Sequence, residues 1–176
     1  MRKLKLEELN RLSVSEFQSK QKIPVVAVLD NIRSAVNVGS VFRTADAFAI
    51  EKIILCGISA TPPNREITKT AIGATESVLW EHIASIKVAV AKLKAEGYKI
   101  LGIEQTDQSI TLDKYDYSFE KIAVIFGNEV DGISDEILED LDFSIEIPQN
   151  GTKHSLNVSV CAGIILWELS NRMQQD

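Results

Sequence analysis

Two short runs of consecutive apolar residues constrain the fold of this chain most. They are VVAVL at Val25–Leu29 and IAVIF at Ile122–Phe126, and neither is interrupted by polar positions. Such runs are typical of strands buried on both faces, as in a parallel sheet covered by helices on each side. Parallel neighbours need long crossover connections, which are usually helical. We therefore expect an α/β domain with a mostly parallel sheet.

Turn residues and hydrophobic periodicity predict the other elements. Expected strands cover Ile53–Cys56, Val78–Trp80, Lys99–Ile103 and residues 143–147, and expected helices cover residues 4–17, Asn37–Phe48, Ile86–Glu96 and the segment ending at Leu169. Residues 58–77 contain Pro62–Pro63 and are expected to form the longest loop. Ser134 is expected to cap a short helix.

Length and composition indicate one globular domain. The chain has 176 residues, of which 45% are hydrophobic and 25% charged. We expect an N-terminal helical extension at residues 1–22 and the α/β domain at residues 23–176. No apolar run is long enough to predict a membrane span, and the first residues do not resemble a secretory signal. Cys56 and Cys161 lie in apolar contexts typical of buried thiols in a reducing cytoplasm, and no cluster with metal-ligand spacing appears.

The charge distribution argues against an indiscriminate nucleic-acid binder. The net charge is −6, whereas such binders are usually basic. A local basic face can still bind phosphates. The candidates lie near turn signals in the first half of the chain, and they are Arg33, Arg43, Arg65 and Lys69. The alternative is that these side chains are only part of a solvated surface.

Three strand-to-helix junctions carry polar and glycine residues where α/β sheets place ligands, beyond the carboxyl ends of strands. They are Asp30–Ala45, Phe126–Ser134 and Ile147–Leu169. Each also has a plain interpretation. Arg43 could be a surface side chain, Glu129 a solvated loop acid, and Asn157 an ordinary helix cap.

The second junction excludes a nucleoside triphosphate site. Gly127 and Gly132 have the spacing of a P-loop, but Ile133 stands where the phosphate-binding Lys is required. No GxGxxG follows a strand either, so a dinucleotide-binding fingerprint is also absent from the sequence.

Taken in order, the three junctions resemble the signature motifs of a known family. NVGSVFRTADAF from Asn37, FGNEVDGIS from Phe126 and IPQNGTKHSLNVSVCAG from Ile147 are similar to motifs of the SpoU/TrmH-like family. These are SPOUT-class RNA ribose 2′-O-methyltransferases that use S-adenosyl-L-methionine. The resemblance covers about residues 24–170. It implies a SPOUT-type α/β knot, with a C-terminal trefoil knot, and a homodimeric cytoplasmic enzyme.

The resemblance also implies site residues. Cofactor contacts are expected at Phe126, Gly127, Ile147, Pro148, Leu156 and Asn157, and catalytic residues at Arg43, Asn37, Glu129, Ser155 and Asn157. Arg43 is the expected central residue. Because arginine resists deprotonation, we expect it to hold the substrate phosphate beside the reacting hydroxyl, with proton removal shared by that phosphate. Glu129 and Asn157 would orient substrate and loop, and Ser155 would fix the turn or touch the ribose.

The expected substrate is tRNA or rRNA. Because only about 22 residues precede the matched region, recognition would rest on the N-terminal helix, on Arg33, Arg43, Arg65 and Lys69, and on a partner subunit, with room for an accessory protein. The last helix has more apolar residues than one face needs, which favours a dimer face; they are Val158, Ile164, Ile165, Trp167 and Leu169. Two alternatives stay open: a catalytically silent RNA- or cofactor-binding module, and a SPOUT base methyltransferase.

Overall fold

A parallel sheet forms the centre of the molecule, as the sequence predicts. The computed structural model describes residues 1–116, 118 and 121–173, so the last three residues of the predicted domain lie outside the described part. The sheet order is β3-β2-β1-β6-β4-β7-β5, and all six neighbouring pairs of described strands are parallel. The strands are β1 (Ile23–Asp30), β2 (Ile50–Cys56), β3 (Leu79–Ile83), β4 (Lys99–Ile103), β5 (Ile110–Thr111), β6 (Ile122–Phe126) and β7 (Phe143–Glu146).

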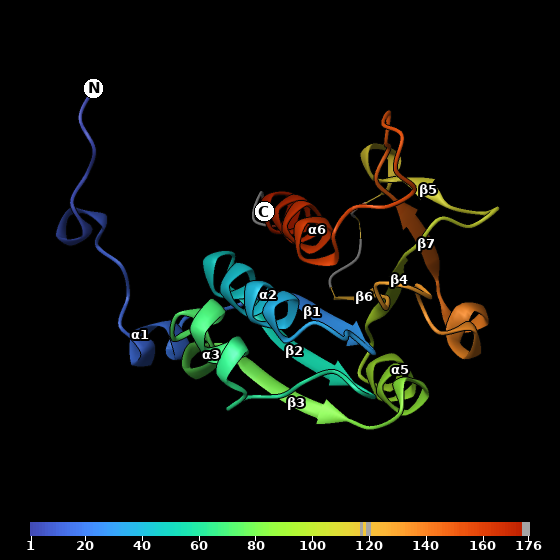
Figure 1. Ribbon diagram of the computed structural model, residues 1–176, viewed down its shortest axis with the longest axis horizontal. Helices are drawn as coiled ribbons and strands as arrows, with labels where there is room; N and C mark the ends of the chain where they lie inside the picture. Colours follow the sequence, from blue (N-terminus) through green and yellow to red (C-terminus); the bar gives the residue numbers. More distant parts are fainter. Residues whose placement is uncertain (117, 119–120, 174–176) are drawn as a thin grey trace.

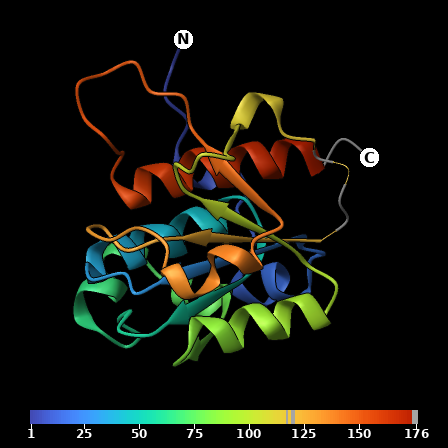
Figure 2. The ribbon, with the colours of Figure 1, turned by 90° about the vertical axis from the view of Figure 1, so that its right-hand side faces the viewer.

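Helices cover both faces of this sheet (Figures 1 and 2). They are α1 (Val14–Ser19), α2 (Ala35–Ala47), α3 (Arg65–Ala71), α4 (Ala74–Ser77), α5 (Ile86–Ala95) and α6 (Val158–Met173), with 3-10 helices η1 (Leu6–Leu9), η2 (Leu112–Lys114) and η3 (Asp135–Asp140). The core on one face contains residues of α1 to α4 and α6, and the core on the other contains residues of α5 and η3.

The central strands β1 and β6 confirm the prediction of burial on both faces. Val25, Ala27 and Leu29 face the core that contains α2 and α6, whereas Val26 and Val28 face the core that contains α5. All five side chains are fully buried. Each buried Val or Leu side chain therefore contributes about 1.5 to 3 kcal/mol of hydrophobic stabilisation, and the smaller Ala27 less.

The prediction of a single helix at residues 4–17 is wrong. The segment forms the short η1 and α1 instead. The part with η1 extends away from the body of the protein, whereas α1 lies against it (Figure 1). Asn10 adopts a left-handed conformation with φ of 46°, which no α-helix can continue through. Ser13 and Glu16 then form a capping box that begins α1. Among the apolar residues of this segment whose side chains the structure describes, Phe17 is the one that reaches the core.

The long loop predicted at residues 58–77 is also wrong, because it contains α3 and α4. The Asn64 side chain accepts the Glu66 N–H and caps α3 just after Pro62–Pro63. Ile67 and Ala71 are buried, and a Cβ at Gly39 of α2 would lie 2.7 Å from the Ile67 carbonyl oxygen. Close packing against α2 thus gives this segment a buried face.

Smaller differences concern the ends of elements. Ser134 precedes η3, but its side chain makes no capping hydrogen bond, and the predicted strand at Val78–Trp80 runs instead from Leu79 to Ile83. The described helices include none that combines the length and the apolar character needed to cross a membrane. The trefoil knot stays a prediction.

Candidate active site

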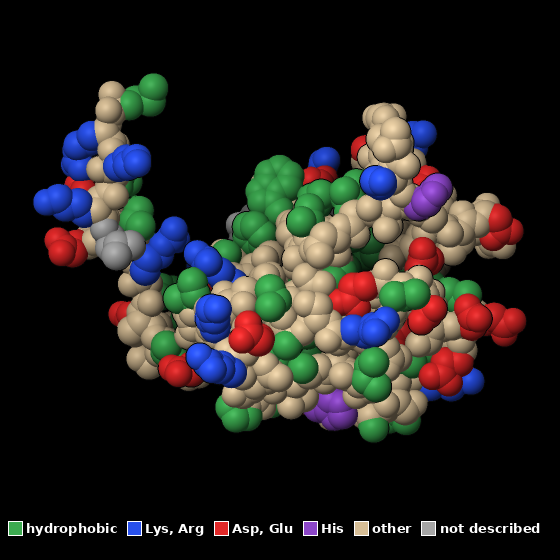
Figure 3. Space-filling view, in the orientation of Figure 1, with side chains coloured by type: hydrophobic (Ala, Val, Ile, Leu, Met, Phe, Trp, Pro, Cys, Tyr) green, Lys and Arg blue, Asp and Glu red, His purple; other side chains and the backbone are tan. Residues whose placement is uncertain are grey.

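A cavity of about 480 Å³ opens at the carboxyl ends of β4, β6 and β7. Its walls come from the ends of these strands, from the loop after β6 and from residues 147–157, which we call the last loop. The last loop projects from the sheet edge beside α6 (Figures 1 and 2), and Figure 3 shows the surface hollowed beneath it. This volume is within the range of sites that bind small molecules.

All charged residues among the described lining of the cavity are acidic. Glu104, Glu129, Asp131 and Glu146 line it, and no Lys or Arg is among its described lining residues. Acidic walls concentrate cations and repel phosphates. The cavity is therefore suited to a small ligand that carries positive charge, and it disfavours nucleoside triphosphates.

The Glu129 carboxylate fastens the loop after β6 to the start of α2. Oε2 accepts the Arg33 N–H at 2.9 Å, and Oε1 accepts the Ser34 N–H at 3.1 Å. Oε1 also accepts from Nδ2 of Asn37 at 3.0 Å. A carboxylate at a helix N-terminus satisfies otherwise unpaired amides and interacts favourably with the helix dipole. Glu129 thus stays exposed, but its carboxylate is bound to the start of α2 and is not the free loop acid of the plain interpretation.

Asn37 links this arrangement to the last loop. Its Oδ1 accepts from Nδ2 of Asn157 at 3.3 Å. The Asn157 Oδ1 in turn accepts the N–H groups of Ser159 and Val160, so it caps α6 at the same time. Three predicted catalytic residues from three junctions therefore form one chain of hydrogen bonds at the cavity.

Burial raises the pKa of Glu129, but the Arg33 amide, the Asn37 side chain and the Ser34 amide act in the opposite direction and outweigh it. The net pKa lies below 4.5, so the charged form is favoured in the folded protein. The contribution of the Glu129 carboxylate to stability is fully present above its pKa in the unfolded chain, near 4.5. This contribution is lost as the pH falls through its lower pKa in the folded protein.

We predict that Glu129→Gln lowers the free energy of unfolding by about 1 kcal/mol at pH 7. One acceptor oxygen of the carboxylate becomes an NH2 group, which cannot accept from the N–H donors that Glu129 binds. The deficit should shrink as the pH falls below 4.5 through the folded pKa. Urea unfolding at pH 7 and at pH 3.5 measures both effects. Glu139→Gln, at an exposed position of η3, is the matched control. An equal deficit at both pH values would contradict the prediction.

Arg43 lies outside this cavity. It lines a separate shallow depression between α2, α3 and α6, together with Ser40, Thr44, Thr70 and Gly163 among other residues. Arg43 is exposed, and six positions along α2 separate it from Asn37, which is about 9 Å along the helix axis. The site therefore has two parts, an acidic cavity and a guanidinium beside it.

The remaining predicted RNA contacts lie on the surface near α2. Arg65 and Lys69 are exposed on α3 and lie four residues apart, so they share one side of that helix. Arg33 precedes α2, where its amide binds Glu129 while the residue stays exposed.

Comparisons with known proteins identify the family of this chain. Residues 24–167 match the model of the SpoU rRNA Methylase family. The chain belongs to the SpoU rRNA methylase family. Among its relatives, the 23S rRNA (guanosine-2′-O-)-methyltransferase RlmB of Neisseria meningitidis is 34% identical over 82% of this chain and 57% of that protein.

Solved structures of SpoU-type proteins have the same fold. A TrmH/SpoU tRNA modifying enzyme of A. aeolicus superposes with a TM-score of 0.81 at 27% identity, covering 92% of this chain and 81% of that one. An AdoMet-bound rRNA methyltransferase of Sinorhizobium meliloti superposes with a TM-score of 0.80 at 26% identity, covering 86% and 57%. The chain thus spans little more than half the length of two of these three relatives.

The family motifs account for most, but not all, of the cavity. Five predicted cofactor contacts line it, namely Phe126, Gly127, Ile147, Leu156 and Asn157, whereas Pro148 is not among the described lining residues. Ser155 also lines it and is exposed. The Cys161 thiol, which also lines the cavity, has its pKa raised to about 11, mainly by burial and secondly by the nearby negative charge of Glu104. This thiol is therefore protonated at neutral pH.

The sequence reasoning missed Glu104 and Gln105, which line the cavity directly after β4. The available signal was their position, because they are the first polar residues beyond the carboxyl end of a buried strand.

Proposed function

We propose that this protein is an S-adenosyl-L-methionine-dependent RNA methyltransferase that acts on a ribose 2′-hydroxyl of tRNA or rRNA. The observation that carries the proposal is the Glu129–Asn37–Asn157 chain beside an acidic cavity, built from the three SpoU motifs. Two relatives named as rRNA methyltransferases, one of them AdoMet-bound, and one named as a tRNA modifying enzyme support the same assignment.

The cavity fits S-adenosyl-L-methionine in size and charge. When bound, this molecule supplies a methyl group on a positively charged sulfur. Four carboxylates among the lining residues favour its sulfonium and ammonium groups. Phe126, Gly127, Ile147, Leu156 and Asn157 would hold it, largely through backbone groups of the two loops. Pro148 remains a proposed contact through its neighbour Ile147.

Arg43 would bind RNA outside the acidic cavity. Its planar guanidinium offers paired donors that match a phosphate. The phosphate beside the reacting ribose would be held there, close to the hydroxyl whose proton must leave. Arg33, Arg65 and Lys69 would bind neighbouring phosphates, while Asn37, Glu129, Ser155 and Asn157 would keep the ribose aligned, and such alignment is a large part of catalysis.

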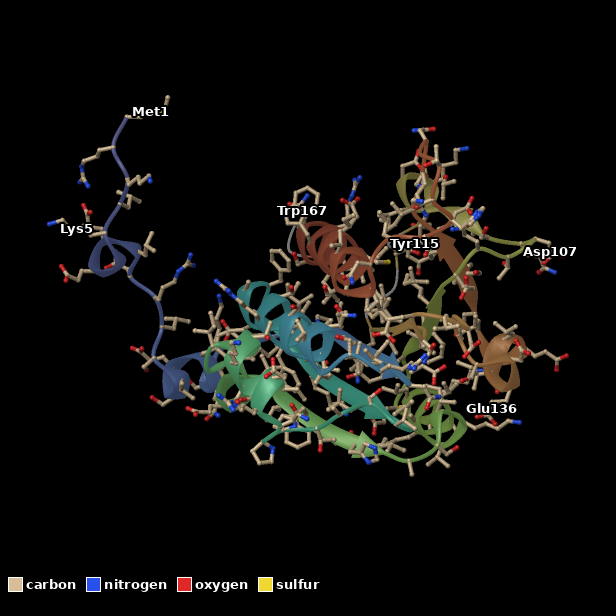
Figure 4. All side chains as sticks on the ribbon, viewed as in Figure 1. Met1, Lys5, Asp107, Tyr115, Glu136 and Trp167 are labelled. Atoms are coloured by element: carbon tan, nitrogen blue, oxygen red, sulfur yellow. The ribbon has the colours of Figure 1, made fainter. Side chains whose placement is uncertain are left out.

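A homodimer is part of this proposal. Val160, Ile164 and Trp167 form an exposed apolar stripe on α6, and Trp167 is 53% exposed. Apolar side chains gather over α6 in Figure 3, and Trp167 points away from the body in Figure 4. The stripe adjoins Gly163, which lines the Arg43 depression. A second copy seated on α6 would lie next to Arg43 and the bound RNA.

We predict that Trp167→Glu converts the dimer to a monomer of 19.5 kDa, because the interface would have to bury an unpaired charge. Light scattering at micromolar concentration measures the mass. Val88→Glu also places a Glu at an exposed apolar position, but on the opposite face of the sheet, where Val88 is 59% exposed on α5. This variant should remain dimeric. A monomeric native protein would contradict the prediction.

Methyl transfer from tritiated S-adenosyl-L-methionine to total tRNA and rRNA tests the function. We expect label in RNA, and mass spectrometry of the digested nucleosides should place the methyl on ribose. Label on a base would support the base methyltransferase alternative. Cofactor binding without transfer to any RNA, even with cell extract added as a source of an accessory protein, would support the silent binding module.

A further inference from the structure

The loop after β6 is held by carboxylates from both neighbouring strands. In the sheet, β6 lies between β1 and β4. Asp30, the last residue of β1, accepts the Ser134 N–H through Oδ2 at 2.8 Å. Glu104, directly after β4, accepts the Ile133 N–H through Oε2 at 3.1 Å. Two consecutive amides of one loop are therefore fixed from opposite sides.

Both oxygens of Glu104 are used by the backbone. Oε1 accepts the Gln105 N–H at 2.9 Å while Oε2 binds Ile133. A Cβ at Gly132 would lie 2.2 Å from Oε2, so the loop approaches this carboxylate as closely as glycine allows. Glu104 also lines the cavity, which means that its carboxylate sets the position of one cavity wall.

Gln105 holds the opposite wall. Its Nε2 donates to the His154 carbonyl oxygen at 2.8 Å, across 49 positions in the sequence. His154 is followed by Ser155, Leu156 and Asn157, which line the cavity. The bond therefore ties the projecting last loop to the end of β4.

We propose that Glu104 and Gln105 are positioning residues that fix the distance between the two cofactor loops. Glu104 acts through the Ile133 amide and Gln105 through the His154 carbonyl, so two adjacent side chains set the width of the cavity. This inference rests on the proposed function, because it takes S-adenosyl-L-methionine as the ligand.

Titration calorimetry with S-adenosyl-L-methionine tests the pair. Gln105→Ala should raise the Kd about fivefold and Glu104→Gln about tenfold, since the first loses a neutral hydrogen bond and the second a charged acceptor. Gln105→Glu keeps the size but loses the donor, so it should weaken binding as much as Gln105→Ala. Gln108→Ala and Glu136→Gln change exposed residues of the same types outside the cavity and should bind as the native protein does; Glu136 is labelled in Figure 4.

Three further measurements separate positioning from general stability. The KM for the cofactor should rise while the KM for RNA stays within twofold, and the Tm without ligand should change by less than about 2 °C for Gln105→Ala. If the Gln105 and Glu104 variants bind S-adenosyl-L-methionine with the Kd of the native protein, this inference is overturned while the proposed function stands. Weaker binding accompanied by a matching loss of Tm would overturn it as well. A native protein that binds no cofactor would overturn the proposed function too.

Discussion

Arg43→Ala is expected to lower kcat for methyl transfer by about 10²- to 10³-fold, the usual effect of removing one group that stabilises charge in a transition state. The Kd for S-adenosyl-L-methionine should stay within twofold, because Arg43 lines a depression separate from the acidic cavity. Its side chain is exposed, so its removal should change the free energy of unfolding by less than about 0.5 kcal/mol. Single-turnover transfer of tritiated methyl groups, calorimetry and urea unfolding measure the three quantities.

Two further variants decide what Arg43 contributes. Arg43→Lys keeps the charge but loses the paired planar donors, so it should restore only a small part of the activity if the phosphate is held in a bidentate manner. Lys87→Ala removes an exposed positive charge from α5, on the opposite face of the sheet, and should leave kcat unchanged. A large loss of cofactor affinity in Arg43→Ala would place the guanidinium in the cavity and contradict the two-part site.

The sheet was predictable because burial leaves a direct trace in the sequence. Strands β1 and β6 are covered on both faces, so every position of β6, and every position of β1 before its last residue Asp30, is apolar. The loop prediction at residues 58–77 failed for a related reason. The turn signal of Pro62–Pro63 and Asn64 is local, whereas the burial of Ile67 against α2 depends on Gly39, far away in the sequence.

The site was predictable only as three separate segments. Asn37, Glu129 and Asn157 follow different strands, and their contacts span 92 and 120 positions. Hydrogen bonds between polar side chains have no sequence period, so residue patterns alone identified candidates and not partners. The family resemblance brought the motifs together, but it gave no role to Glu104 or Gln105, because their contacts are with backbone groups of other loops.

Gly127→Ala is expected to destabilise the protein by about 3 kcal/mol and to abolish cofactor binding. A Cβ at this position would lie 2.2 Å from the Gly132 carbonyl carbon and 2.3 Å from the Ile133 nitrogen. Both are backbone atoms that cannot rotate away, so the loop must shift, and such overpacking costs about 1 to 3 kcal/mol or more. The loop closes through paired hydrogen bonds between Asn128 and Gly132, of 2.8 and 3.0 Å.

A shift of this loop would move Glu129 away from the start of α2 and Ile133 away from Glu104, so the two walls of the cavity would separate. Urea unfolding and calorimetry with S-adenosyl-L-methionine measure both losses. Gly151→Ala is the matched control, because no atom lies within 4 Å of its added Cβ, and it should change the free energy of unfolding by less than about 0.5 kcal/mol. A Gly127→Ala protein of native stability that still binds the cofactor would mean that the loop can reposition without losing the site, and that close packing of Gly127 against Gly132 does not define the cavity.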